Sequence, residues 1–306
     1  MTNILLYIGA IAASCAQSAF TKQNTRRGDG SAESAGTFNL FKAVAVFAVL
    51  LMIFLFDRSW NAATIGWGAA YGVLLTVSMI TGYYALKTGP MALTSMIVSF
   101  SLLIPYAYGI IFLGEKPKLV QVEGLGMFIL ALVLINWNQL HVKGVAHSKN
   151  GVHENEGAAQ PQKASGRWAM FTALTLIANG FCSIVQKGHQ NIYPGMYTSW
   201  FMAVAGLTAC ILFLIRFVWQ RNKVRLKAKN AVKYGILGGI SNGIANLILL
   251  VLAATENASI LYPVVSAGTM LSVFVTGRIV FKEKMSPMQT AGFVVGLMAI
   301  VLLKAL

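Results

Sequence analysis

The sequence predicts an all-α membrane protein with ten transmembrane helices, arranged as two inverted five-helix repeats. Three observations support this prediction: an apolar composition, ten long apolar stretches and an internal repeat. Of the 306 residues, 57% are hydrophobic and 11% are charged, and the mean hydropathy is +0.67. Soluble domains carry about 25% charged residues, so this chain has too few to cover a surface that faces water. The composition therefore indicates an integral membrane protein.

The chain repeats one of its own segments. Residues 90–137 correspond to residues 258–305 without a gap, so that Glu115 aligns with Glu283, 168 positions later. The other aligned pairs are Gly109 with Gly277, Lys116 with Lys284, Gln121 with Gln289 and Gly124 with Gly292. Each copy consists of an apolar run, a Glu-Lys turn and a second apolar run. Such a repeat of apolar helices is typical of transporters that are built from two structural halves.

A membrane-spanning helix needs about 20 apolar residues. Ten stretches satisfy this: 3–22, 38–56, 65–86, 90–113, 119–138, 168–187, 196–217, 232–253, 258–281 and 286–305. Residues 1–138 form the first five-span repeat, residues 139–167 a polar linker and residues 168–306 the second repeat. Because five is an odd number, the second half must enter the membrane from the opposite side, which makes the repeat inverted.

Glycine pairs also recur between the halves. Gly68 and Gly72 in the third span correspond to Gly235 and Gly239 in the eighth. A Gly-xxx-Gly pair lets a neighbouring helix approach closely in lipid. We therefore expect close helix contacts at both pairs.

The basic residues indicate an orientation, because cytoplasmic loops are enriched in lysine and arginine. On one face the sequence places only Arg58, Lys116, Lys118, Lys187 and Lys304. The other 19 of the 24 basic residues belong to the opposite face. This count predicts that both termini lie outside and that the linker lies in the cytoplasm. Anionic lipid headgroups account for the net charge of +15, so no nucleic-acid partner is expected.

Several motifs carry a resemblance to a known family. They are Leu113-Gly114-Glu115-Lys116 with Gly124, Phe281-Lys282-Glu283-Lys284 with Gly292, the lysines Lys22 and Lys187 that close the first span of each half, and Pro105. Together they resemble the drug/metabolite transporter superfamily, and within it the ten-span EamA-type members. The resemblance covers 3–138 and 168–305 and implies transport of small solutes. The chain departs from the family at Lys282, which replaces a glycine, and in its charge count, since ten-span members are often expected to have their termini inside.

Lys22 and Lys187 are the first candidates for substrate contact. Polar residues precede both lysines: Ser14, Gln17 and Ser18 in the first half, and Asn179, Ser183 and Gln186 in the second. At helical spacing, Ser14 and Ser18 share one face with Lys22, and Asn179 and Ser183 share one with Lys187. Such a polar stripe should turn away from lipid and could line a pathway where the lysines attract a carboxylate or phosphate. Alternatively, the lysines snorkel to the interface and the small polar residues join helices.

Four further polar residues lie in the middle of spans. Ser78 and Asn246 correspond across the repeat, and Ser99 and Ser266 lie near the centres of the fourth and ninth spans. The resemblance implies that these helices surround a central cavity. All four are therefore candidate substrate-binding residues.

The acidic residues argue against export of cations. Glu115 and Glu283 lie at helix ends beside a lysine, where capping or pairing is a simpler role than carrying protons. The stretches AASCAQSAFTK in the first span and IANGFCSIVQK in the sixth contain no acid. A neutral or anionic substrate fits this pattern better than a cationic one.

The sequence thus predicts a secondary or facilitative transporter of a small organic metabolite, such as an amino acid, that works by alternating access. Two alternatives remain open: a carrier of lipid-linked or nucleotide-linked sugars, and a non-transporting membrane partner or receptor. The chain contains no nucleotide-binding loop or catalytic motif, so we expect no enzyme activity and no cofactor. His141, His147 and His153 are interpreted as solvated linker residues rather than metal ligands. We expect a monomer or homodimer among membrane lipids in the plasma membrane, as in a bacterial inner membrane.

Overall fold

The computed structural model describes residues 2–27, 32–88, 94, 97–135, 166–219, 229–280 and 287–304. Within these ranges every regular element is helical. In chain order they are α1 (Thr2–Arg27), α2 (Ala32–Asp57), α3 (Ala62–Thr88), the short 3-10 helix η1 (Phe100–Leu102), α5 (Leu103–Phe112), α6 (Leu119–Ile135), α8 (Gly166–Ile192), α9 (Thr198–Trp219), α10 (Lys229–Thr255), α11 (Ala258–Ile279) and α12 (Pro287–Lys304). Each predicted span overlaps one of these elements, with η1 and α5 together in the fourth span.

Some sequence predictions fall on positions outside the described residues. These are the three linker histidines, nearly all of the linker 139–167, and the second Glu-Lys turn with Lys282, Glu283 and Lys284.

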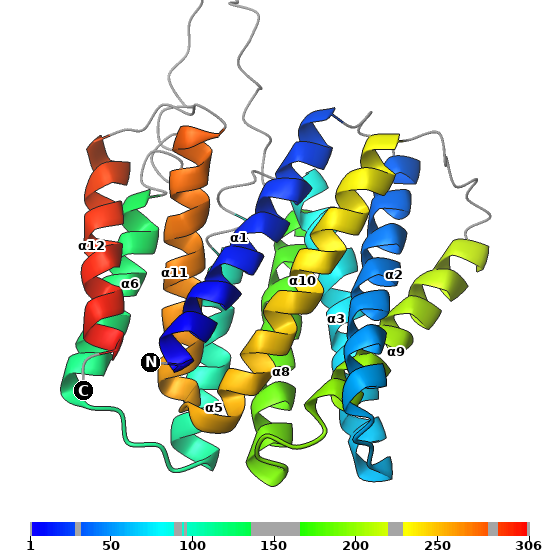
Figure 1. Cartoon of the computed structure of the whole chain (residues 1–306). Coiled ribbons are helices and arrows are strands. Elements are labelled where there is room, and N and C mark those ends of the chain that lie inside the picture. The colour runs from blue at the N-terminus through cyan, green and yellow to red at the C-terminus, as the bar shows by residue number, and fades with distance from the viewer. Residues whose placement is uncertain are drawn as a thin grey trace, which may run out of the picture.

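Among the described residues, six helices are long and apolar enough to cross a membrane: α1, α2, α3, α8, α9 and α10. Four shorter apolar helices cover Ile97–Phe112, Leu119–Leu134, Ala258–Val273 and Thr290–Leu303. Together these helices indicate a multi-pass membrane protein. In Figure 1, α1 begins and α12 ends at the lower end of the bundle. An even number of crossings places both ends of the chain on one side, as observed.

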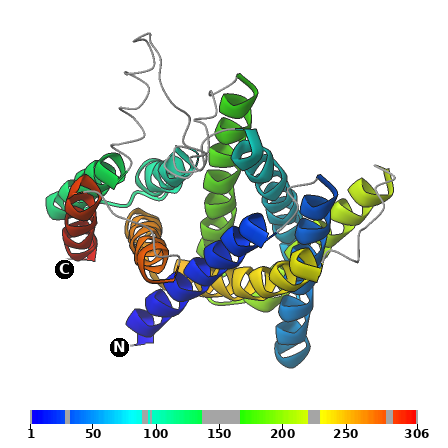
Figure 2. The same ribbon diagram turned by 90° about the horizontal axis from the view of Figure 1, so that it is seen from above.

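Helices that are far apart in the sequence pack side by side. α3 packs against α8 and α9, whereas α10 packs against α1 and α2. α6 and α12 form a pair at one side of the molecule, next to α11 (Figure 2). In Figure 1, α1 runs from the lower end to the upper end, and α8 runs the opposite way. The first helices of the two halves therefore have opposite directions.

The first glycine pair lies where α3 meets α9. A Cβ atom on Gly68 would lie 2.7 Å from the carbonyl oxygen of Phe201, and one on Gly72 would lie 2.5 Å from that of Ala205. Any larger residue would force the two helices apart. The predicted close contact is confirmed here.

The second glycine pair allows an equivalent close contact between α10 and α2. A Cβ atom on Gly235 would lie 2.8 Å from the carbonyl oxygen of Phe38, and one on Gly239 would collide with the carbonyl of Lys42. This prediction is also confirmed. Both halves therefore use glycines on their third helix to receive the second helix of the other half.

The two largest of four apolar clusters in the described parts of the chain contain most of the buried core. The larger one lies among α1, α6, α10, α11 and α12, and Phe128, Leu252 and Leu261 are fully buried in it. The other lies among α2, α3, α8, α9 and α10 and includes Phe201 and Leu250. The polar groups described next lie beside this second cluster, on the same helices.

Candidate functional site

A chain of polar side chains links α3, α8 and α10. The hydroxyl of Tyr71 donates a hydrogen bond of 2.7 Å to Oδ1 of Asn246 and accepts one of 3.3 Å from Nε2 of Gln186. Asn246 in turn donates to Oδ1 of Asn242 over 2.6 Å. We call these four residues the polar core. Tyr71, Gln186 and Asn242 are all buried. The network is therefore enclosed between helices that are long enough to cross the membrane.

A second group of contacts involves residues that the sequence predicted. The hydroxyl of Ser78 on α3 donates a hydrogen bond to Oδ1 of Asn179 on α8. One turn further along α8, the hydroxyl of Ser183 donates to the carbonyl of Asn179 over 3.3 Å. The hydroxyl of Tyr262 on α11 reaches the carbonyl of Ser183 over 2.8 Å. The structure thus brings Ser78, Asn179 and Ser183 together where α3, α8 and α11 converge.

The local sequence explains why these groups face one another. Asn179 and Ser183 are four residues apart, as are Asn242 and Asn246. In a helix this spacing places two side chains on one face. Since an isolated polar group in hydrocarbon is costly, such faces turn toward other helices. The polar stripe predicted for α8 therefore contacts α3 and α11.

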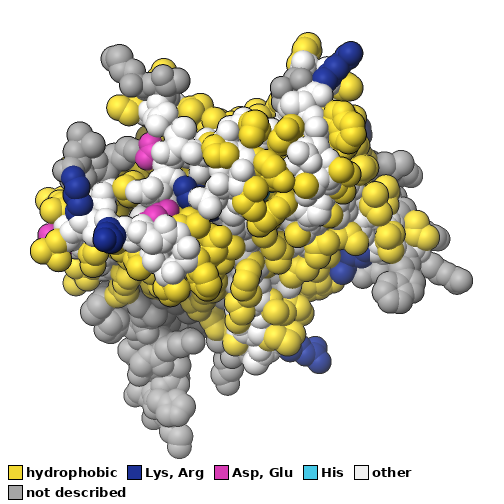
Figure 3. Space-filling model, turned by 90° about the horizontal axis from the view of Figure 1, so that it is seen from below, with side chains coloured by type: hydrophobic (Ala, Val, Ile, Leu, Met, Phe, Trp, Pro, Cys, Tyr) yellow, Lys and Arg dark blue, Asp and Glu magenta, His cyan; other side chains and the backbone are white. Residues whose placement is uncertain are grey.

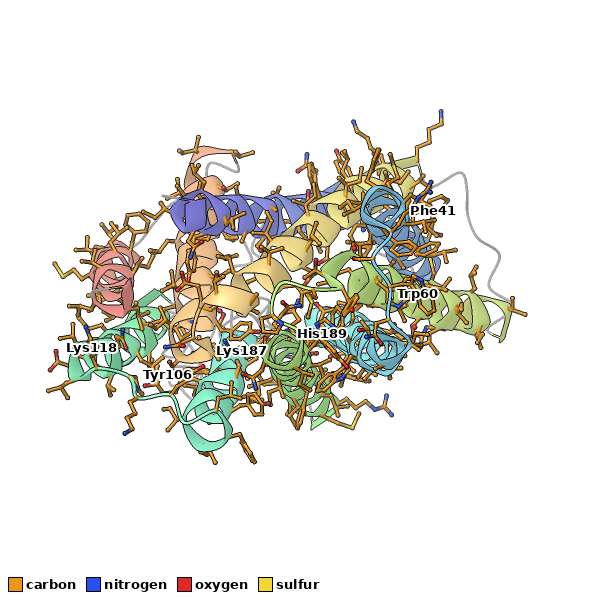
Figure 4. The ribbon with its side chains drawn as sticks, turned by 60° about the horizontal axis from the view of Figure 1, so that its bottom comes forward. Phe41, Trp60, Tyr106, Lys118, Lys187 and His189 are labelled. Atoms are coloured by element: carbon orange, nitrogen blue, oxygen red, sulfur yellow. The ribbon has the colours of Figure 1, made fainter. Side chains whose placement is uncertain are left out.

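Lys187 occupies a well-defined position. Its side chain is buried, and Nζ donates hydrogen bonds to the carbonyl oxygens of Ala253, over 3.1 Å, and Glu256, over 2.5 Å. Ala253 is in the last turn of α10 and Glu256 follows it directly; at this end a helix leaves acceptors unpaired and its dipole favours a cation. Figure 4 shows Lys187 on α8 in the middle of the bundle. Neither sequence interpretation of this lysine, substrate contact or snorkelling, anticipated these bonds.

Glu115 caps the start of α11, far along the chain. Its carboxylate accepts hydrogen bonds from the backbone N–H groups of Ala258, over 2.8 Å, and Ser259, over 2.9 Å. Gly114 precedes it with a φ of +65°, a conformation that glycine adopts without strain. The capping interpretation is therefore confirmed for Glu115, whereas Glu283 lies outside the described part of the chain.

The turn between α10 and α11 is also tied to α1. The side chain of Asn3 donates a hydrogen bond of 2.9 Å to the Glu256 carboxylate. With the bonds from Lys187 and Glu115, three separate parts of the chain hold this one turn. On this end of the molecule, acidic and basic side chains lie close together within a mostly apolar face (Figure 3).

The α1 candidates remain separate from this arrangement. Ser14, Gln17, Ser18 and Lys22 are all partly buried, and the hydroxyl of Ser18 donates to the carbonyl of Ser14 over 3.0 Å. Lys22 lies five residues before the end of α1 at the upper end of the bundle, whereas Lys187 lies near the lower end of α8. The structure does not bring the two lysines together.

Ser99 and Ser266 are partly buried, Ser99 immediately before η1 and Ser266 within α11. Their contact with substrate stays a prediction.

Three residues of these two groups were not considered from the sequence: Tyr71, Asn242 and Tyr262. Gln186 was noted only as a polar residue before Lys187. Asn242 could have been predicted from the sequence, since it lies one helical turn before the candidate Asn246. Tyr71 and Tyr262 could not have been predicted in this way, because tyrosines are common at membrane interfaces and do not by themselves indicate a buried hydrogen bond.

No group of three or more potential metal ligands is found among the described residues. Cys15, Cys182 and Cys210 are free thiols. The polar core consists of amide and hydroxyl groups, which can form hydrogen bonds with a solute.

Comparisons with known proteins agree with the helical architecture. The model of the EamA-like transporter family matches residues 4–137. No curated protein matches the sequence. A solved protein crystal structure resembles this chain with a TM-score of 0.73 and 13% sequence identity, over 99% of this chain and 97% of its own. At that identity the likeness shows the fold alone.

Proposed function

We propose that this chain carries a small organic solute across the plasma membrane by alternating access, as a secondary or facilitative transporter. The match of residues 4–137 to the EamA-like transporter family supports this proposal. The substrate is a neutral or anionic metabolite. The observation that carries this proposal is the polar core, in which buried amides and a hydroxyl meet between three membrane-crossing helices.

The chemistry of the polar core supports such a substrate. Polar side chains are expensive inside a membrane and commonly mark substrate pathways. The core and its neighbours Ser78, Asn179 and Ser183 contain no carboxylate, so they offer hydrogen bonds rather than a counter-charge for a cation. A solute with hydroxyl, amide or carboxylate groups could exchange bonds with them.

The helix contacts support the inverted repeat on which alternating access depends. The two glycines of α3 meet positions 201, 204, 205 and 208 of α9, and the two glycines of α10 meet positions 38, 41, 42 and 45 of α2. Each position on α9 lies 163 residues after the corresponding position on α2, from 201 and 38 to 208 and 45. Exchanging the halves therefore reproduces the same contact, as expected for repeats related by a pseudo-two-fold axis.

The test is solute uptake by purified protein in proteoliposomes, with and without a pH gradient. A panel of amino acids, sugars and phosphorylated metabolites covers the substrate classes. We expect saturable flux of at least one solute. Asn246→Leu removes both bonds that link Tyr71 to Asn242 and should lower that flux on the order of tenfold or more, as loss of a buried hydrogen bond of 1–3 kcal/mol implies. Asn230→Leu, at an exposed position near the start of α10, is the matched control.

Normal flux in Asn246→Leu would place the substrate elsewhere. Flux of a glycolipid but of no small solute would favour the lipid-linked sugar carrier. Absence of all flux in the wild-type protein would favour a non-transporting membrane partner.

A further inference from the structure

Lys42 is a buried lysine within a membrane-crossing helix. The apolar span of α2 covers Gly36–Phe56, and Lys42 lies six residues inside it, about 9 Å from the nearer end at 1.5 Å per residue. Only 7% of its surface is exposed. It follows Phe41, which is labelled on α2 in Figure 4. An ionisable residue at this depth is a candidate functional group.

The ammonium group of Lys42 has no partner in the described parts of the chain. Lys187, the other buried lysine there, is held by two carbonyl oxygens. Among the described residues, Lys42 has no such bond, no ion pair and no contact with an aromatic face. The carboxylates of Glu115 and Glu256 belong to the α10–α11 turn at the lower end of the bundle. α2 begins at the upper end (Figure 1), and Lys42 lies in its first half.

Helix packing does not explain the lysine. Gly239 of α10 packs against the backbone of Lys42, and Gly72 of α3 packs in the same manner against Ala205 of α9. At the equivalent contact an alanine is therefore sufficient. The close approach of α2 and α10 therefore does not by itself require a lysine at position 42, and burying a charge without a partner is costly.

We propose that Lys42 binds an anionic group of the transported substrate, a carboxylate or a phosphate, within the membrane. This inference rests on the proposed function and narrows it from a neutral or anionic solute to an anionic one. It also assigns the substrate-binding cation to α2, instead of to Lys22 or Lys187. Lys187 instead holds the α10–α11 turn. The pseudo-two-fold symmetry is broken at this site, because Ala205 offers no second charge.

The first experiment compares flux of anions and of neutral solutes in proteoliposomes. Glutamate, lactate and inorganic phosphate are the anions, and glucose and glycerol are the neutral solutes. Lys42→Gln should lower anion flux at least on the order of tenfold, since the pairing of a buried charge is lost, and Lys42→Arg should retain most of it. Lys229→Gln, which removes the same charge from an exposed position, should leave flux unchanged. Flux of glutamate or lactate would identify a carboxylate as the bound group, whereas flux of inorganic phosphate would identify a phosphate.

A binding measurement separates failure of the site from failure of the proposed function. If anions raise the melting temperature of the purified wild-type protein but not of Lys42→Gln, the site is supported even when no solute is carried. Unchanged anion flux in Lys42→Gln overturns the site and leaves the transporter intact. The anion site is also overturned if the wild-type protein carries neutral solutes while anions are neither carried nor raise its melting temperature.

A cysteine variant tests access without relying on transport. In a protein whose three native cysteines are replaced, Lys42→Cys should react with a negatively charged thiol reagent from the aqueous phase. Met52→Cys, on the exposed apolar side of the same helix, should not react, because lipid surrounds it. Absence of reaction at position 42 would contradict the proposal.

Discussion

At the α10–α11 turn, a single carboxylate satisfies two backbone N–H groups that the start of a helix leaves unpaired. Glu115 supplies it from the connection between α5 and α6. Its negative charge also suits the positive end of the α11 dipole. The same residue looks like a proton carrier if only its recurrence in the repeat is considered. Its hydrogen bonds identify it as a cap.

Replacing Glu115 should therefore lower stability. Glu115→Gln keeps one acceptor oxygen, loses the charge and should cost about 1 kcal/mol. Glu115→Ala loses both bonds and should cost more. The midpoint of thermal unfolding in detergent measures both changes. Glu123→Gln, which removes a carboxylate from an exposed position of α6, is the control. A midpoint unchanged by Glu115→Ala would contradict the capping role.

The sequence candidates differ in how far they could be predicted. Asn179 and Ser183 were found from their helical spacing to Lys187, and Ser78 from its correspondence to Asn246 in the repeat. The partners of Lys187 could not be found in this way, since its bonds reach carbonyls 66 and 69 residues away and depend on how three helices cross. Lys42 was overlooked because its counterpart in the repeat, Ala205, is apolar.

At the scale of helices, the glycine pairs were the most reliable signal. Helix association in lipid depends on close packing, because apolar side chains gain little by leaving a solvent that is also apolar. Gly68 and Gly72 could therefore be interpreted without knowing their partner. That the partner is α9 followed only from the structure, since the sequence does not specify which helix enters the groove.

Gly72→Ala should disrupt this contact. The added Cβ would lie 2.5 Å from the carbonyl oxygen of Ala205, and overpacking of this kind costs about 1–3 kcal/mol. Gly66→Ala is the matched control, because Gly66 lies on the same helix and has nothing within 4 Å of the added atom. Thermal unfolding of the two variants should differ by several degrees. Equal midpoints would show that α3 and α9 can separate without penalty.

At the scale of the whole molecule, the charges predict the direction of the bundle in the membrane. Arg58 lies between α2 and α3 at the end where α1 begins, and Lys229 starts α10 at the opposite end. The count of basic residues assigns Arg58 and both termini to the outside and Lys229 to the cytoplasm. The opposite orientation is the one often expected of the ten-span transporters that the motifs resemble.

Labelling in intact cells decides between the two orientations. In a protein without native cysteines, Arg58→Cys should react with a membrane-impermeant maleimide, while Lys229→Cys should react only after the cells are permeabilised. Both positions are exposed, so a difference in labelling reports the side of the membrane rather than burial. The reverse result would place both termini in the cytoplasm. The basic segment before α10 would then face outward, and its charge would need an explanation other than retention in the cytoplasm.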